Sequence, residues 1–400
     1  MNEPNLADLC ELVVDCKNRT PPEAAPSETP MGFAIGTPDI VDGRIRLSAA
    51  KPVSKETFGI WTARAVPREG DVVLTREAPV GRVGRIEAGM NICLGQRTML
   101  LRPDRRRCDS RFLHYFLLSP AVQERLHAQA SGSTVAHLRV AQVRDLRVPV
   151  VPGVDEQFRI GALLGALDDK IAINERIADT ARELGLTLFS QAILEGKEIE
   201  VQVDSVSSVL TRGIAPKYSD ATDDLVVLNQ KCIRDGRVSL APARLTLREK
   251  VKGPKLLCRN DVLVNSTGVG TLGRVARWTS DGEGTVDSHI TIVRFDEVVV
   301  DPVCAGFAIL RAQPEIEAMG EGSTGQTELR RAQLGALKVT LPSKAQQRRL
   351  RPQLDSLEER ADQALDESLS LTHLRDALLP QLMSGRLRVK DAEKIVEDHA

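Results

Sequence analysis

Short apolar runs and long apolar periodicities alternate along this chain of 400 residues. Four of the short runs are rich in β-branched residues and are bounded by Gly, Pro or Asp, which predicts β-strands. They are DVVLT at 71–75, TMLLRP at 98–103, DVLVNS at 261–266 and HITIVRF at 289–295. Residues 110–130 instead carry apolar side chains at helical spacing. The mixture predicts an α+β fold class built from mixed α/β domains.

Two long segments carry apolar residues at alternating steps of four and three, the a/d seam of a coiled coil, apart from a wider last step. The first seam consists of Ile160, Leu164, Leu167, Ile171, Asn174, Ala178, Ala181 and Leu188. The second consists of Leu350, Leu354, Leu357, Ala361, Ala364, Ser368, Leu371 and Leu378, each 190 positions later. Because two unrelated helices would rarely share a register, the match favours a pairing of the two helices with each other. The alternative is that each helix packs only on its own domain.

The rest of the chain also repeats itself, with an offset close to 190 residues. The matched blocks are GDVVLTREAPVGRVGRI at 70–86 with NDVLVNSTGVGTLGRV at 260–275, GSTVAHL at 132–138 with GSTGQTEL at 322–329, LRVPV at 146–150 with LKVTL at 337–341, and DGRI at 42–45 with DGRV at 235–238. The repeat predicts a first domain at 1–152, a long helix at 153–197, a second domain at 198–342, a second long helix at 343–390 and a tail at 391–400. The internal repeat gives the molecule a pseudo-twofold organisation.

The start of the second long helix has two interpretations. Ser343 and Gln346 form a capping-box pattern, which predicts a start at this point. Pro352 is unfavourable inside a helix and favourable at its first position, so a start at Pro352 is the alternative.

Composition narrows the class of protein. The 54 basic and 55 acidic residues nearly cancel, which argues against a protein that merely coats nucleic acid. The seven cysteines are scattered without a CxxC pair, so we expect reduced thiols and no metal site. No apolar run approaches the ~20 residues of a membrane span. We therefore expect a cytoplasmic protein without a membrane partner.

Two glycine-rich segments resemble nucleotide-binding motifs. Residues 268–273 satisfy GxGxxG, but a strand and a turn follow them where a Rossmann fold requires a helix, so we predict a tight hairpin. An NAD-dependent oxidoreductase is the alternative. Residues 322–327 suggest a phosphate loop, but no Lys follows, which argues against ATP binding. The chain also lacks a nucleophile elbow, a convincing nuclease centre and the Asn-Pro-Pro-aromatic motif of amino-methylating enzymes. We expect no catalytic residues and no cofactor in this chain.

The matched blocks, in their order and in two copies, resemble the specificity subunit of type I restriction-modification systems. The resemblance rests on IGTPDIVDGRI, GDVVLT with its following VGRVG, GSTVAHL before LRVPVVPGVDEQFRIGALLGALDDKI, and HLRDALLPQLMSGRLRV, and it covers residues 9–390. It implies two target recognition domains, each reading one half of a split DNA site, and two long helices that pair as an antiparallel coiled coil. The sequence departs from the family at Pro352 and at the small seam residues Ala361, Ala364 and Ser368.

The resemblance also implies partners. They are double-stranded DNA, two methyltransferase subunits and the restriction and translocase subunits, and those subunits would use S-adenosylmethionine, ATP and Mg. Half-site spacing would follow from helix length, and the divergence of the copies predicts an asymmetric site. The near-zero net charge suggests that partner subunits hold much of the duplex. A rival hypothesis is a tandem-domain coiled-coil adaptor that does not read DNA.

For DNA contact we predict polar and basic residues of the matched loops, which suit phosphates and base edges. In the first copy they are Arg76, Arg82, Arg85, Gln96, Arg97, Ser133, Thr134, His137 and Arg139. In the second copy they are Asn265, Ser266, Thr267, Thr271, Arg274, Ser288, His289, Gln326, Thr327 and Arg330. For subunit docking we predict equivalent helix positions, namely Glu156, Gln157, Asp168, Asp169, Lys170, Gln346, Gln347, Glu358, Glu359 and Arg360. The alternative for the first two sets is a solvated surface residue or one that only positions the backbone, and the alternative for the docking set is an ordinary charged flank of a coiled coil.

Overall fold

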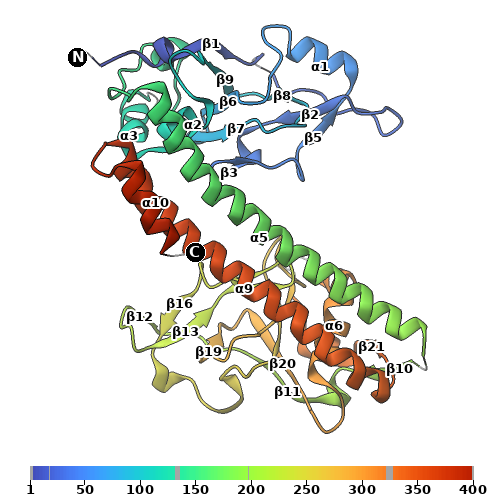
Figure 1. Ribbon diagram of the computed structural model, residues 1–400. Helices are drawn as coiled ribbons and strands as arrows, with labels where there is room; N and C mark the ends of the chain where they lie inside the picture. The colour runs from blue at the N-terminus through green and yellow to red at the C-terminus, as the bar shows by residue number, and fades with distance from the viewer. Residues whose placement is uncertain (1–2, 18, 131–135, 197, 321–327, 399–400) are drawn as a thin grey trace. The chain divides into compact units, whose positions relative to one another are not determined.

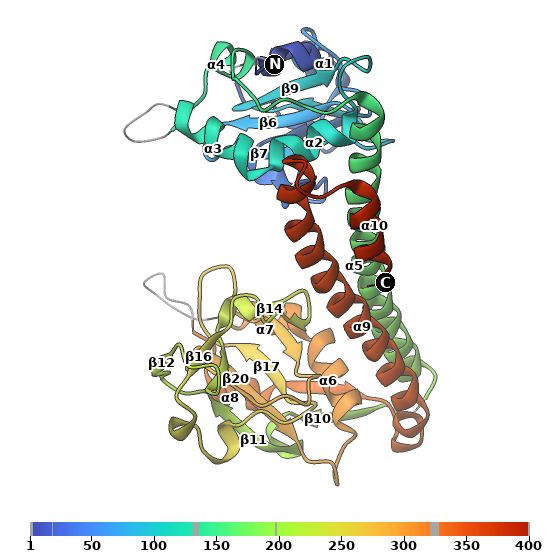
Figure 2. The same cartoon turned by 60° about the vertical axis from the view of Figure 1, so that its left-hand side comes forward.

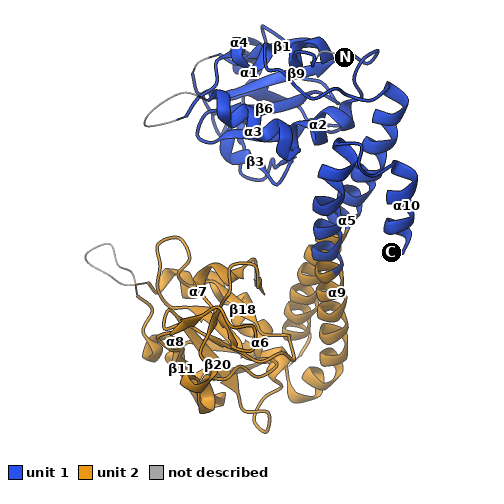
Figure 3. Ribbon diagram, turned by 90° about the vertical axis from the view of Figure 1, so that its left-hand side faces the viewer, with its two compact units in different colours: residues 1–173, 367–400 blue, residues 174–366 orange. Residues whose placement is uncertain are grey.

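A computed structural model describes residues 3–17, 19–130, 136–196, 198–320 and 328–398. The chain forms two compact units (Figure 3). Unit 1 comprises Met1–Ile173 and Glu367–Ala400, and unit 2 comprises Asn174–Asp366. There are two long helices, α5 (Val154–Leu194) and α9 (Lys344–Met383). Each helix contributes one half to unit 1 and the other half to unit 2. Within the described part of the chain, no helix is long and apolar enough to cross a membrane.

Unit 1 is built on an antiparallel sheet in the order β1–β9–β6–β7, with a smaller sheet β5–β2–β8 and a short β3–β4 hairpin. Its strands are β1 (Cys10–Asp15), β2 (Gly32–Ile35), β3 (Ile40–Val41), β4 (Arg44–Ile45), β5 (Lys51–Val53), β6 (Val72–Arg76), β7 (Val80–Arg85), β8 (Ile92–Leu94) and β9 (Thr98–Pro103). Its shorter helices are α1 (Lys55–Trp61), α2 (Ser110–Leu118), α3 (Pro120–Gln129), α4 (Val140–Arg144) and α10 (Val389–Glu397) (Figure 1).

Unit 2 repeats this plan with an antiparallel sheet in the order β11–β20–β17–β18 and a smaller sheet β12–β16–β13–β19. Its strands are β10 (Ile199–Gln202), β11 (Ser207–Arg212), β12 (Tyr218–Ser219), β13 (Leu225–Leu228), β14 (Ile233–Arg234), β15 (Arg237–Val238), β16 (Arg244–Thr246), β17 (Val262–Asn265), β18 (Val275–Arg277), β19 (Gly284–Val286), β20 (Ile290–Phe295) and β21 (Lys338–Leu341). Its shorter helices are α6 (Pro302–Arg311), α7 (Gln313–Ala318) and α8 (Arg331–Ala336) (Figure 2). The α+β fold expected from the sequence is confirmed.

The position of the central strands, with the sheet buried on both faces, explains why their sequences are continuously apolar. In β6, Val72 and Leu74 pack into the core that α2 covers, whereas Val73 faces the core shared with the smaller sheet. In β17, 190 residues later, Val262 and Val264 pack toward α6 and Leu263 points to the other face. Since successive strand side chains point to opposite faces, a sheet that is buried on both faces needs apolar residues at every position. The two units share this pattern residue by residue.

The seam of the long helices is buried as predicted. Leu188 and Leu357 are partly buried, and every other seam residue is buried. Within unit 1 the first half of α5 shares a core with the second half of α9, for example through Leu164 and Leu378. Within unit 2 the second half of α5 packs against the first half of α9, for example through Ala178 and Ala361. The halves are therefore antiparallel in each unit.

Helix α9 begins at Lys344 and continues through Pro352, so the alternative start at Pro352 is wrong. The capping box forms, since the Gln346 backbone N–H donates to Ser343 Oγ at 3.4 Å and the Ser343 N–H donates to Gln346 Oε1 at 3.2 Å. Proline lacks the N–H that would bond to the carbonyl of Arg348. Both Arg348 and Pro352 are exposed, which leaves that carbonyl open to water.

The C-terminal segment differs from the prediction. Helix α9 ends at Met383, before the predicted end at residue 390, and Gly385 follows it with a φ of 69°. Glycine adopts such a positive φ without steric cost, which suits a helix terminus. The segment expected as a tail forms most of α10, because Val389 and Ala392 lie on one helical face and are buried in the core of unit 1.

Candidate nucleic-acid interface

Both units use the same hydrogen bonds to gather three loops at one end of the main sheet. In unit 1 the N–H of Arg76 donates to the carbonyl of Arg97 at 2.8 Å, and the N–H of Leu138 donates to the carbonyl of Arg76 at 2.9 Å. We call this end the loop edge. In unit 1 it consists of residues 76–79, 95–97 and 137–139.

In unit 2 the N–H of Ser266 donates to the carbonyl of His289 at 2.8 Å, and the N–H of Leu329 donates to the carbonyl of Ser266 at 2.8 Å. The loop edge of unit 2 consists of residues 265–274, 287–289 and 328–330. The loop edges of the two units contain most of the residues predicted for DNA contact.

In unit 1 the loop edge is charged. Arg97 is exposed, and its Nε lies 3.6 Å from Glu77 Oε1. The Arg76 guanidinium is half-buried and donates to the carbonyl of Leu138 at 3.3 Å, which ties the third loop to the sheet. Gln96 Oε1 accepts a 3.4 Å hydrogen bond from Thr20. The exposed Arg97 side chain is therefore better placed to meet a ligand than Arg76.

The remaining residues predicted in unit 1 divide into three groups. His137 lies on the loop edge in a bridge with Glu77, and Arg139 is exposed at the start of α4. Arg82 adjoins the edge, but its guanidinium donates to the carbonyl of Thr37 at 2.9 Å. The structure does not bring Arg85 to this edge, because it lies at the opposite end of β7 and pairs with Glu87 at 3.0 Å. Ser133 and Thr134 lie outside the described residues.

In unit 2 the loop edge carries a neutral polar pair in addition to charged residues such as Glu328, which pairs with Arg212 at 2.7 Å. His289 is exposed, and its Nδ1 lies 2.8 Å from Thr267 Oγ1. The amide of Gln230, which the sequence did not single out, donates to the carbonyl of Thr267 at 2.7 Å and to its Oγ1 at 2.8 Å. Beneath them, burial raises the pKa of the Asp287 carboxyl, while the hydrogen bond from the His289 N–H partly opposes this rise. His289 and Thr267 thus form a polar pair at the surface, and the hydrogen bonds from Gln230 hold Thr267 in place.

Two predicted contact residues are completely buried. Asn265 donates its amide to the carbonyls of Gln230 and Thr271, at 3.0 and 3.1 Å. Ser266 Oγ lies 2.5 Å from Thr291 Oγ1. Both side chains hold the loop in place rather than face solvent.

The other predicted residues of unit 2 lie around the loop. The side chain of Arg274 donates to the carbonyl of Gly270 at 2.8 Å, and that of Thr271 to the carbonyl of Gly268 at 3.4 Å. Ser288 is half-buried, and Arg330 is exposed at the start of α8. Gln326 and Thr327 lie outside the described residues. The GxGxxG segment lies in the connection between the antiparallel strands β17 and β18, so the predicted hairpin forms, but with nine connecting residues it is not tight.

Sequence reasoning missed a matched pair of buried ion pairs that hold the sheets. In unit 1 the Arg102 guanidinium binds both carboxylate oxygens of Asp71, at 2.8 and 2.7 Å. In unit 2 Arg294 binds Asp261 in the same way, at 2.7 Å to each oxygen. These hydrogen bonds raise the pKa of both guanidiniums. The sequence contained a signal for these ion pairs, because the aspartates and arginines recur at matching positions of the two copies.

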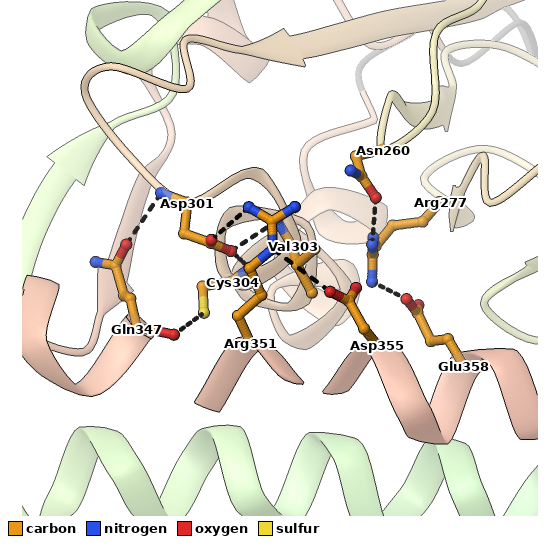
Figure 4. Close-up of polar contacts among 9 residues, drawn as sticks. All are labelled: Asn260, Arg277, Asp301, Val303, Cys304, Gln347, Arg351, Asp355 and Glu358. Atoms are coloured by element: carbon orange, nitrogen blue, oxygen red, sulfur yellow. Dashed lines mark hydrogen bonds and ion pairs between the residues drawn. The ribbon is translucent and has the colours of Figure 1, made fainter. Parts of the chain in front are cut away.

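Gln157 and Gln347, predicted for subunit docking, are buried instead. Gln157 accepts from the N–H of Asp109 at 3.0 Å, and Gln347 accepts from the N–H of Asp301 at 3.1 Å (Figure 4). Each amide also donates to the carbonyl of the proline five residues earlier, at 2.8 and 2.7 Å. A glutamine amide can both donate and accept hydrogen bonds. Each of these side chains therefore bonds to one backbone N–H and one backbone carbonyl near the first turn of its long helix.

Two acidic docking candidates also face their own domains. Asp168 accepts from the Tyr115 hydroxyl at 2.5 Å and from Arg375 at 2.6 Å. Glu358 forms an ion pair with Arg277, whose side chain is almost completely buried (Figure 4). Burial raises the pKa of Glu358 to about 7, against the opposing effect of Arg277.

The other docking candidates lie closer to solvent. Asp169 pairs with Arg111 at 3.3 Å, Lys170 pairs with Glu367 at 3.0 Å, and Glu156 pairs with Arg159 at 3.6 Å. Gln346 donates to the carbonyl of Ala192 at 2.9 Å. Glu359 and Arg360 are exposed on α9. Of the predicted set, Asp169, Lys170, Glu359 and Arg360 are exposed to solvent.

Comparison with known proteins agrees with the resemblance. Residues 2–182 match the family model of the type I restriction modification DNA specificity domain. The type I restriction enzyme EcoBI specificity subunit of Escherichia coli is 26% identical over 122 residues, which are 30% of this chain and 25% of that protein. The MjaIX specificity subunit of Methanocaldococcus jannaschii is 24% identical over 127 residues, which are 32% of this chain and 28% of that protein. The aligned part thus spans about a quarter of the length of these relatives.

A solved structure extends the likeness in fold to both units. The crystal structure of the type I restriction-modification system S subunit from M. genitalium matches with a TM-score of 0.59 and 18% identity, and the match covers 95% of each chain. This likeness concerns the fold alone. Among the described residues no group of three His, Cys, Asp or Glu side chains is placed to hold a metal ion.

Proposed function

We propose that this protein is the sequence-reading subunit of a type I restriction-modification system, because residues 2–182 match the family model of the type I restriction modification DNA specificity domain. Each unit would read one half of a split DNA site with its loop edge. The observation that carries this proposal is the recurrence, in both units, of the same backbone hydrogen bonds, which gather the three loops at one end of the sheet. A sheet with a fixed loop edge can present several side chains to one groove at once.

The two half-sites should differ in sequence. Unit 1 presents Arg97 with Glu77, whereas unit 2 presents His289 with Thr267. A guanidinium suits the acceptor edge of guanine or a phosphate, while hydroxyl and imidazole groups suit other base edges. The spacing of the half-sites would follow from the 41 and 40 residues of α5 and α9.

We assign catalysis to partner subunits. Two methyltransferase subunits would dock near the long helices, with Glu359 and Arg360 among the exposed candidates, and restriction and translocase subunits would join them. Those subunits would use S-adenosylmethionine, ATP and Mg, while this chain would contribute only recognition. A reader of cellular DNA would act in the cytoplasm.

The test begins by identifying a methyltransferase subunit that forms a complex with this chain, first among the products of the neighbouring genes. Methylome sequencing of a host that expresses both should reveal one bipartite, asymmetric motif. Duplex DNA carrying that motif should then bind the complex more tightly than scrambled DNA, and log Kd should rise linearly with log salt concentration. Methylation without a motif, or no salt-dependent affinity for DNA at all, would contradict the proposal and favour the adaptor hypothesis.

A further inference from the structure

The loop at residues 266–274, between β17 and β18, is held rigidly by its own hydrogen bonds. The backbone N–H of Leu272 donates to the carbonyl of Gly268 at 3.0 Å, and the N–H of Gly273 donates to the carbonyl of Asn265 at 2.8 Å. Side chains from inside the unit add further bonds, as described for Asn265 and Gln230. The polar groups of this loop are therefore largely occupied within the unit.

Val269 is the apolar side chain that this loop presents to solvent. It is 86% exposed. Its neighbours Gly268 and Gly270 have φ angles of 106° and 73°, which residues with a side chain rarely adopt. By contrast, Leu272 of the same loop packs against the core. The glycines thus set Val269 at the apex of a fixed loop, beside the surface pair of Thr267 and His289.

Exposure alone does not mark a site, since single exposed apolar residues are common on protein surfaces. Val298 in the same unit is 88% exposed, but it follows the C-terminal end of β20, at the opposite end of that strand from His289. Unit 1 has no counterpart of Val269, because only residues 77–79 connect β6 to β7. What distinguishes Val269 is its position on the loop edge together with the rigidity of its loop.

We propose that Val269 is a specificity-determining residue that packs against the C5 methyl group of a thymine in the half-site read by unit 2. This inference rests on the proposed function. Thymine is the base that presents a methyl group in the major groove, and a side chain without hydrogen-bonding groups recognises it by apolar contact. Insertion between base pairs is the competing role, but the residues that act as wedges are generally longer than valine.

The test removes each side of this contact separately. In the complex with the methyltransferase subunit, each thymine of the half-site is replaced in turn by uracil, which lacks only the methyl group. We expect one position at which uracil lowers the affinity about three- to fivefold, the effect of losing one buried methyl contact. Val269→Ala should lower the affinity for thymine DNA by a similar factor, and should abolish the difference between thymine and uracil at that position.

Val298→Ala is the matched control, since it removes the same atoms from an equally exposed valine, and it should retain the full sensitivity to uracil. A half-site in which no uracil weakens binding would overturn the inference, as would a sensitivity to uracil that Val269→Ala leaves intact. A wedge would also overturn the inference. It would be indicated if Val269→Ala lowered the affinity equally for thymine and uracil DNA, and if the wild-type complex, but not the variant, raised the fluorescence of a 2-aminopurine placed at one base step. If the wild-type complex shows no site-specific binding, the proposed function itself fails, and this outcome is distinct from the others.

Discussion

The two units share their scaffold and differ at their loop edges. The bidentate pair of Asp71 with Arg102 recurs as Asp261 with Arg294, and the buried Gln157 recurs as Gln347. At the loop edge, however, three residues connect β6 to β7, whereas nine residues connect β17 to β18. A duplicated domain that keeps its internal hydrogen bonds can change its surface loops freely, because the loops do not hold the sheet.

The opposite end of the main sheet has diverged as well. After β9 the turn reads Asp104 followed by three exposed arginines, while after β20 it reads Asp296 followed by Glu297, Val298 and Val299. Both turns are held in the same way, since Asp104 accepts from the N–H of Arg106 at 3.1 Å and Asp296 accepts from the N–H of Val298 at 2.9 Å. The shared bond fixes the turn, and the side chains at its tip are free to vary.

The largest expected effect concerns the shared ion pairs. Arg294→Ala leaves Asp261 buried without its partner, which should lower the free energy of unfolding of unit 2 by about 3–5 kcal/mol. Arg102→Ala should lower that of unit 1 by a similar amount. Hydrogen exchange at β17 and at β6 would report the two losses separately. Lys338→Ala, which removes an exposed pair with Glu200, should change the free energy of unfolding far less than either buried pair does. Equal small losses in all three variants would contradict a structural role for the buried pairs.

The next effect concerns the difference between the loop edges. On DNA with an intact half-site for unit 1, Arg97→Ala should bind about tenfold more weakly than the wild type. On DNA with that half-site scrambled, the variant and the wild type should bind almost equally. His289→Ala should show the same behaviour for the half-site of unit 2. Competition binding with one half-site scrambled at a time measures both. Variants that respond identically to either scrambled half-site would break the assignment of one half-site to each unit.

A third effect is a pH dependence of unit 2 that comes from Glu358. Burial raises the pKa of Glu358 from its ordinary value of 4.5 to about 7. Between these pH values the unfolded chain releases this proton while the folded unit keeps it, so the free energy of unfolding falls as pH rises. Glu358→Gln should reduce that fall by about 1–3 kcal/mol. Chemical denaturation between pH 4.5 and 7.5 checks this, with the exposed Glu359→Gln as control. An unchanged pH slope in Glu358→Gln would contradict it.

Several features of the fold could be predicted from the sequence because they repeat. Matched apolar positions predicted the strands, the loop connections and the helix seam. The buried glutamines were missed because polar residues were assigned to the surface. Yet Gln157 lies three positions before Ile160, so it continues the seam, and Gln347 stands in the same relation to Leu350. A polar residue at a seam position is a signal for a buried hydrogen bond.

The candidate site was predicted less completely. Thr267 and His289 lie on the loop edge as expected, but Asn265 and Ser266 do not reach solvent. Their burial depends on bonds to Gln230 and Thr291, which are distant in sequence and cannot be inferred from local pattern. For the same reason the sequence did not indicate that Val269 occupies the apex of its loop.

We propose that each unit reads its own half of the DNA site. The most direct test of this proposal replaces residues 1–152 with the corresponding domain of another specificity subunit and then sequences the methylome of cells that also express the methyltransferase subunit. One half of the methylated motif should change to the half-site of the donor, while the other half keeps its sequence. A change in both halves, or in neither, would contradict it.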